Sequence, residues 1–188
     1  MLPCSAIHRG FTLIELLVTV ALIAILAAIA TPSLKSLIVN NKIQAATTEI
    51  HSVLAGARAE SVKRGGDARV TVVANTLSGS TPNWSSGITV FYDTTANANG
   101  NTPPTDATKL IMKTDALPTD ISINVNFNHI IFNGLGRTIT STGAPTGGAI
   151  AVGTAGYDWR CVIVSLTGRV RTKKITDAAY NADGCTTS

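Results

Sequence analysis

The feature that most constrains this chain is the run of twenty residues from Phe11 to Ala30, which contains a single charged side chain, Glu15. As an α-helix rising about 1.5 Å per residue, the run would be ~30 Å long, which is the thickness of the hydrocarbon core of a bilayer. His8 and Arg9 lie just before it, and positive charge beside an apolar run tends to stay in the cytoplasm. The sequence therefore predicts one membrane-spanning helix, with the C-terminal bulk of the chain outside the cytoplasm.

Two ordinary kinds of segment also contain an apolar run near the N-terminus. A cleaved secretory signal ends at a small-residue site, and Ala28-Ile29-Ala30 has that form. A simple membrane anchor is the second alternative. Neither explains Glu15, because a carboxylate costs about 2.5 to 3.5 kcal/mol at the centre of a membrane helix and is normally there for a partner.

Residues 10–15 read Gly-Phe-Thr-Leu-Ile-Glu and are followed by the apolar run and by Pro32. This segment resembles the class III leader of type IV pilins and of type II secretion pseudopilins. The resemblance implies that a prepilin peptidase cuts between Gly10 and Phe11 and methylates the new N-terminus. It also implies that Glu15 pairs with the freed ammonium group of a neighbouring subunit in a helical filament.

After Pro32 the apolar residues keep a helical spacing, and the helix is expected to end near Arg64, before Gly65-Gly66. Pro32 removes one backbone hydrogen bond, so a bend or a melted turn is expected there. The stripe that should face a sheet consists of Leu34, Leu37, Ile38, Ala45, Ala46, Ile50, Val53, Leu54, Ala57 and Val62.

Beyond Gly66 the apolar period changes to two, which predicts short antiparallel strands. Two polar segments, Asp93 to Thr108 and Thr138 to Gly148, are expected to be loops, and the first to be poorly ordered. The expected strands are 68–74, 87–92, 109–114, 121–127, 129–132, 149–152, 160–166 and 169–175.

The later part of the chain resembles the GspH/FimT branch of pilin-like proteins, on the segments Trp84 to Phe91, Ile131 to Arg137 and Val162 to Arg171. The resemblance implies an α+β, type IV pilin-like fold, in which a long N-terminal helix packs on an antiparallel head of two sheets. The expected divisions are a leader (1–10), a membrane-spanning and filament-core helix (11–30), an amphipathic half of the helix (31–66) and a β-rich head with a basic tail (67–188).

Cysteine usage agrees with export. Cys4 falls in the expected leader, which leaves Cys161 and Cys185 as an even pair in a chain that leaves the cytoplasm. A disulfide is expected, and two unpaired thiols are the alternative.

A basic segment lies near the C-terminus. Arg160, Arg169, Arg171, Lys173 and Lys174 fall within fifteen positions that contain no acidic residue. Strand alternation puts Arg169, Arg171 and Lys173 on one face at steps of about 6.5 to 7 Å, close to the spacing of phosphates along a nucleic acid strand. Gly168-Arg169-Val170-Arg171 also resembles the G-R-x-R pattern of DNA-binding minor pilins of this branch, which capture DNA for natural transformation.

The alternative for this segment is a solvated edge strand, because lysine and arginine on sheet edges block aggregation without any ligand. Trp84, Trp159 and Tyr157 could stack on bases, but packed aromatics are the favoured interpretation.

Catalysis has little support in the sequence. Outside the leader, His51 and His129 are the remaining histidines, and neither has the spacing of a zinc ligand. Gly134-Leu135-Gly136 lacks the third glycine of a dinucleotide site and is expected to be a loop bend. No catalytic residue, metal or cofactor is therefore expected.

The sequence thus predicts a minor type IV pilin that binds DNA without sequence preference through its basic tail. Its expected partners are other pilin subunits, the prepilin peptidase, DNA and, before assembly, the bacterial inner membrane, with a single span and the head in the periplasm. A pseudopilin of a type II secretion system is the first alternative, and a minor pilin that only primes assembly is the second.

Overall fold

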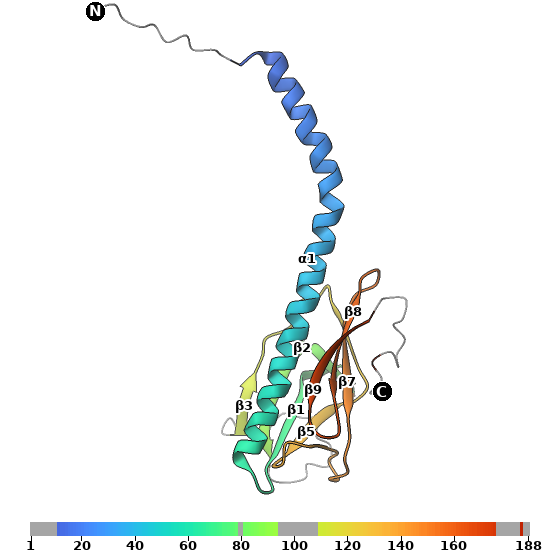
Figure 1. Ribbon diagram of the computed structural model, residues 1–188. Coiled ribbons are helices and arrows are strands. Elements are labelled where there is room, and N and C mark those ends of the chain that lie inside the picture. The colour runs from blue at the N-terminus through green and yellow to red at the C-terminus, as the bar shows by residue number, and fades with distance from the viewer. Residues whose placement is uncertain (1–10, 79–80, 94–108, 176–184, 186–188) are drawn as a thin grey trace, which may run out of the picture. The chain divides into compact units, whose positions relative to one another are not determined.

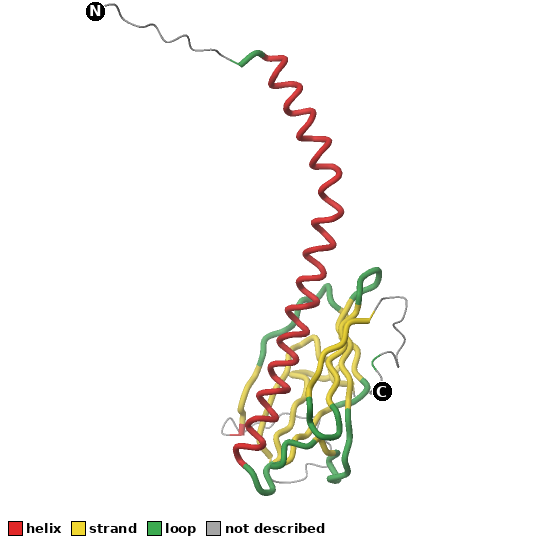
Figure 2. The backbone as a smooth tube through the Cα atoms, in the orientation of Figure 1, coloured by secondary structure: helices red, strands yellow, loops and turns green. Residues whose placement is uncertain are grey.

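The computed structural model describes residues 11–78, 81–93, 109–175 and 185. The leader, the 94–108 part of the expected long loop and most of the basic tail beyond Ile175 lie outside the described residues. The chain divides into two compact units, Met1–Ile38 and Val39–Ser188. Within the described residues the elements are one helix, α1 (Leu13–Arg64), followed by nine strands (Figures 1 and 2).

The first unit contains the apolar half of α1, which is long and apolar enough to cross a membrane by length and composition. The helix continues without interruption through Pro32, so the expectation of a melted turn there is wrong. One missing hydrogen bond is not enough to end the helix, because the i→i−4 bonds on either side of the proline remain.

In the second unit α1 buries one face against the head. Ala45 and Val62, which the sequence placed on that face, are exposed, and Ile43 is buried instead. The helix ends at Arg64 as expected, since Gly65 and Gly66 take positive φ angles of 62° and 54°. The buried apolar residues of the helix recur at steps of three and four and are Ile43, Ala46, Ile50, Val53, Leu54 and Ala57.

All the strand pairs are antiparallel, as predicted, and they form two sheets. The first has the order β3-β2-β1-β5-β6 and the second β4-β7-β8-β9. The first sheet is built from β1 (Arg69–Ser78), β2 (Thr81–Asp93), β3 (Leu110–Lys113), β5 (His129–Asn133) and β6 (Thr138–Ile139). The second is built from β4 (Ser122–Val125), β7 (Gly148–Gly153), β8 (Trp159–Val164) and β9 (Val170–Ile175).

Two sequence expectations need correction. The segment 138–148, expected to be a loop, contains β6 and a bridge between Ile139 and Pro145. Strands β1 and β2 extend beyond 74 and before 87, and they pair as a hairpin with a register shift between Ala74 and Thr76. These pairings follow from partners in space that the local apolar period does not report.

The head has one main core, shared by α1 and both sheets. Phe132 of the first sheet and Val162 of the second belong to the same buried cluster as Ile50 of the helix. On its other face the second sheet carries a smaller buried cluster, which consists of Ala149, Ala151, Trp159, Cys161, Ile163, Ile175 and Cys185. An ion pair between Lys42 and Asp120, at 2.7 Å, further ties the helix to the head and holds the pKa of that carboxyl below its usual value.

Candidate nucleic-acid interface

Strand β9 forms one edge of the second sheet and carries most of the predicted basic residues. It pairs with β8, so that Arg171 lies opposite Ile163 and Lys173 lies opposite Cys161. Directly opposed residues of an antiparallel pair share a face, and Ile163 and Cys161 belong to the small outer cluster. Arg171 and Lys173 are exposed and therefore flank that cluster on the outer face of the sheet.

Arg160 and Lys174 lie on the opposite face of the sheet from Arg171 and Lys173. They are opposed in the β8–β9 register, and both have partners within the head. The guanidinium of Arg160 donates to the side-chain oxygen of Gln44 on α1 at 3.3 Å, and Lys174 pairs with Asp158. The register thus divides the basic segment between two faces of an edge strand.

Arg169 lies just before β9, in the hairpin that joins β8 to β9. Its carbonyl accepts from Ser165 N–H at 3.0 Å, and its own N–H donates to the Ser165 hydroxyl at 3.2 Å. Arg169 is exposed and lines a cleft of about 570 Å³ together with His51, Lys63 and Val62 of α1. Arg169 therefore lies between the exposed residues of β9, Arg171 and Lys173, and the C-terminal end of α1.

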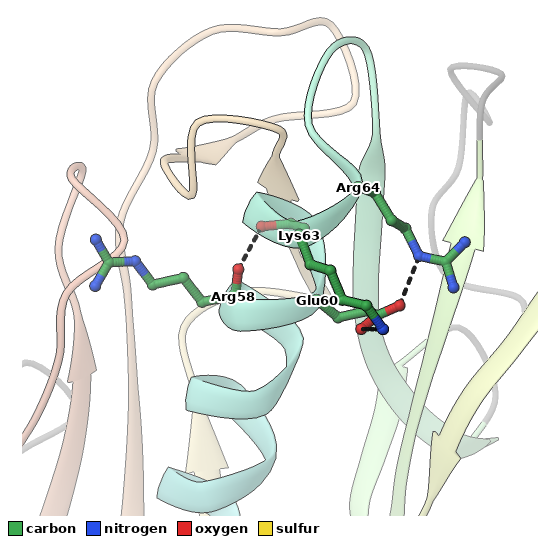
Figure 3. A network of polar contacts seen from close by, with 5 residues as sticks. Arg58, Glu60, Lys63 and Arg64 are labelled. Atoms are coloured by element: carbon green, nitrogen blue, oxygen red, sulfur yellow. Dashed lines mark hydrogen bonds and ion pairs between the residues drawn. The ribbon is translucent and has the colours of Figure 1, made fainter.

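Arg58 of α1 holds this region together, a role that the sequence did not reveal. Its guanidinium donates to the Gly136 carbonyl at 3.1 Å and to the Thr167 carbonyl at 3.4 Å. Both acceptors lie in turns that are distant from Arg58 in sequence. The residues around Arg58 in the helix therefore do not indicate that its guanidinium makes these contacts. In Figure 3 its side chain points away from Glu60, Lys63 and Arg64, which lie on another side of the helix.

The disulfide between Cys161 and Cys185 is present in the structure, with the two Cα atoms 5.7 Å apart. Both cysteines are buried in the small outer cluster. Because Cys161 lies opposite Lys173, the bridge fixes Cys185 on the same face of the sheet as the exposed pair Arg171 and Lys173.

Comparison with known proteins assigns the chain to a family. A model described as type II transport protein GspH matches residues 46–168, more than half of the 188 residues. The chain belongs to the GspH family. A second model, described as a prokaryotic N-terminal methylation motif, matches residues 6–31, which include Gly10, Phe11 and Glu15.

Two solved structures share the GspH-family fold of this chain, and both are crystal structures of the type IV minor pilin FimU of Pseudomonas aeruginosa. The P21 form has 19% identity and a TM-score of 0.52, and the match covers 71% of this chain and 90% of that one. The P65 form has 19% identity and a TM-score of 0.50, with 69% and 91% covered. No curated protein matches the sequence significantly. Family and fold are those of structural pilin-like subunits.

Glu15 has a local partner in this GspH-family chain. The backbone N–H and the hydroxyl of Thr12 donate to its carboxylate at 2.9 and 3.0 Å, and Glu15 N–H donates to the Thr12 hydroxyl at 3.3 Å. This reciprocal arrangement is a capping box, for which Thr-x-x-Glu is the sequence signal. The carboxylate therefore caps its own helix in the single subunit, a role that was not predicted from the sequence.

The two tryptophans are packed, as expected, whereas His51 and His129 are half-buried. Trp84 and Trp159 are buried, and Trp84 meets Phe127 edge to face with 5.4 Å between ring centroids. Burial lowers the pKa of His129. Among the described residues, no group of three His, Cys, Asp or Glu side chains could hold a metal ion.

Proposed function

We propose that this GspH-family chain is a minor type IV pilin that binds DNA without sequence preference through the outer face of β9, for uptake in natural transformation. The observation that carries the proposal is the exposed pair Arg171 and Lys173 on a sheet edge. They belong to a segment, 160–174, that contains five basic residues and no acidic one. Binding of this kind is dominated by counterion release from phosphates.

We further propose the processing and location that the leader implies. The prepilin peptidase removes residues 1–10, methylates Phe11 and leaves residues 11–30 as the membrane and filament-core helix. Residues 31–66 then carry the amphipathic half, and residues 67–188 form the head in the periplasm. In the filament, Glu15 exchanges its bond with Thr12 for the ammonium group of a neighbouring subunit. Mass spectrometry of the mature protein would test the processing, because a start at methylated Phe11 excludes an uncut anchor and cleavage after Ala30.

A second candidate function is a pseudopilin of a type II secretion system. One observation favours it: the match to the family described as type II transport protein GspH ends at residue 168, immediately before the basic strand. The family alone therefore does not carry DNA binding, and the cations of β9 are the feature that separates the two functions.

The test measures binding of the full-length protein in detergent micelles to a short fluorescent DNA duplex, over a series of salt concentrations. The logarithm of the binding constant falls with the logarithm of the salt concentration, with a slope of about −0.9 for each phosphate contact. Each contact therefore makes the binding constant about 8-fold larger at about 0.1 M salt than at 1 M salt. Arg171→Ala with Lys173→Ala should therefore weaken binding by up to about 60-fold and reduce the slope by about 1.8.

The matched control is Lys109→Ala with Lys113→Ala, which removes one positive charge just before β3 and one at its end, on an edge strand of the first sheet. We expect this variant to keep most of the affinity and the slope. Salt-independent binding by the wild-type protein, or equal effects of the two double variants, would contradict the proposed interface and favour the secretion subunit.

A further inference from the structure

Two turns of the head have the same construction, and each ends in Gly-Arg. In residues 133–137, Asn133 N–H donates to the Arg137 carbonyl at 2.9 Å, and Gly136 N–H donates to the Asn133 carbonyl at 2.7 Å. In residues 165–169, Ser165 N–H donates to the Arg169 carbonyl at 3.0 Å, and Gly168 N–H donates to the Ser165 carbonyl at 2.8 Å.

The agreement between the two turns extends to the backbone angle and to the side-chain bond that closes each loop. Gly136 and Gly168 have φ angles of 70° and 75°, which place each glycine in the left-handed region. The Arg137 N–H donates to the Asn133 side-chain oxygen at 3.0 Å, as the Arg169 N–H donates to the Ser165 hydroxyl. Arg137 is thus the structural counterpart of Arg169.

The two turns pack against each other. A Cβ atom on Gly168 would overlap the carbonyl oxygen of Gly136 and lie 2.9 Å from its carbonyl carbon, so only glycine allows this approach. Arg58 bridges the pair from α1 through the carbonyls of Gly136 and Thr167. Arg137 and Arg169 therefore belong to two packed turns, 133–137 and 165–169, that Arg58 holds together, although the two arginines are distant in sequence. We call this pair of turns the junction.

The last turns of α1 add further positive charge beside the junction. Lys63 has 77% of its side chain exposed and lines the same cleft as Arg169. Its carboxylate neighbour, Glu60, lies at 3.5 Å but is shared with Arg64, which binds it at 2.8 Å and also stacks on Tyr92. Glu60 therefore cannot neutralise both cations of this helix turn.

Arg137 lines a neighbouring cleft of about 410 Å³, together with Leu166 and Thr167 of the β8–β9 hairpin. No acidic residue is among the described residues that line either cleft. Arg137 and Arg169 thus line neighbouring clefts at one end of the head, and Lys63 lines the cleft of Arg169 from α1 with its ammonium turned toward Glu60.

We propose that Arg137 is a second phosphate-binding arginine equivalent to Arg169, and that Lys63 completes the contact, so that the DNA interface extends from β9 over the end of α1. The inference rests on the proposed function and enlarges its site. Arg58 is the positioning residue of this surface, since its guanidinium is used by two carbonyls.

The test uses full-length protein in detergent micelles and the same fluorescent duplex. Lys63→Ala with Arg137→Ala should weaken binding by about 8-fold for one lost contact and about 60-fold for two, with a slope reduced by about 0.9 for each. The variant Lys63→Arg with Arg137→Lys keeps both positive charges, so its salt dependence should have the same slope as that of the wild-type protein. A loss of binding caused by misfolding in the alanine variant would not be corrected in this way. The control remains Lys109→Ala with Lys113→Ala.

The outcomes separate the two proposals. If the wild-type protein shows no salt-dependent binding, the proposed function fails, and the extended interface fails with it. If the wild-type protein binds, Arg171→Ala with Lys173→Ala weakens it, and Lys63→Ala with Arg137→Ala behaves like the control, then only the extended interface is wrong. Equal melting temperatures of the variants establish that the comparison concerns binding.

Discussion

Replacement of Gly168 by alanine is the sharpest test of the junction at the end of α1. Gly168 has a φ of 75°, and a Cβ atom there would overlap the Gly136 carbonyl group and lie 3.3 Å from the Arg58 guanidinium. The substitution therefore imposes two separate costs, an unfavourable backbone conformation and a collision with backbone atoms that cannot rotate away.

The magnitudes of the two costs can be estimated separately. A left-handed conformation costs an L-residue about 1 to 2 kcal/mol, and overpacking at a tight contact typically costs about 1 to 3 kcal/mol. Gly168→Ala should therefore lower the free energy of unfolding by about 2 to 5 kcal/mol. In a domain of this size each kcal/mol corresponds to a shift in Tm of about 2 to 4 °C.

Gly156→Ala is the matched control, because Gly156 has a φ of 81° but a Cβ atom there would have no neighbour within 4 Å. It should show the backbone cost alone, about 1 to 2 kcal/mol. The assay is thermal unfolding of the full-length protein in detergent, followed by near-UV circular dichroism of the buried Trp84 and Trp159. If Gly168→Ala is no less stable than Gly156→Ala, the packing of the two turns is not as described.

Three further predictions concern other parts of the chain. Reduction of the Cys161–Cys185 bridge, which spans 24 residues, should lower stability by about 3.5 kcal/mol in the chain-entropy model, measured as the change in Tm with dithiothreitol; an unchanged Tm would contradict it. Burial lowers the pKa of His129 from 6.5 in the folded protein, so the unfolded chain binds the proton first as the pH falls. The free energy of unfolding should therefore decrease below about pH 6.5 and become constant below the folded pKa. His129→Gln should flatten this part of the pH–stability curve, and a curve identical to that of the wild-type protein would refute the assignment. Glu15→Gln should leave the protein in the membrane but prevent its incorporation into filaments, measured by immunoblotting of sheared fibres; wild-type incorporation would exclude the proposed pairing between subunits.

The parts of the fold that the sequence predicted are those in which local pattern and tertiary contact agree. The end of α1 at Arg64 follows from Gly65-Gly66, and the antiparallel strands follow from the period of two. The extension of β1 and β2 was not predicted, because it depends on Asn75 at the register shift. The Asn75 side chain donates to the carbonyls of Ser86 and Thr114 at 3.0 and 2.8 Å, and these partners are separated from it in sequence.

The basic segment shows the same limit at the candidate site. Alternation predicted Arg169, Arg171 and Lys173 on one face of a strand. Arg171 and Lys173 do share the outer face of β9, but Arg169 lies before the strand, in the hairpin, and lines the cleft beside α1. Alternation could not show that Lys174 meets Asp158 either, because that pairing depends on the β8–β9 register. The match between the two Gly-Arg turns was visible as Gly136-Arg137 and Gly168-Arg169 in the sequence. Their contact was not, since it needs the positions of both hairpins in space.

The bridge made by Arg58 also bears on how the protein is synthesised. Its two acceptors lie 78 and 109 residues further along the chain, so α1 leaves the ribosome long before the turns that hold its last part exist. The buried strand residues that share the core with Ile50 and Leu54 run from Val70 to Val164, so this face of the helix gains its cover only gradually and stays accessible to chaperones or proteases while the head is made. The apolar face of the helix is therefore incompletely covered for most of the time in which the head is synthesised.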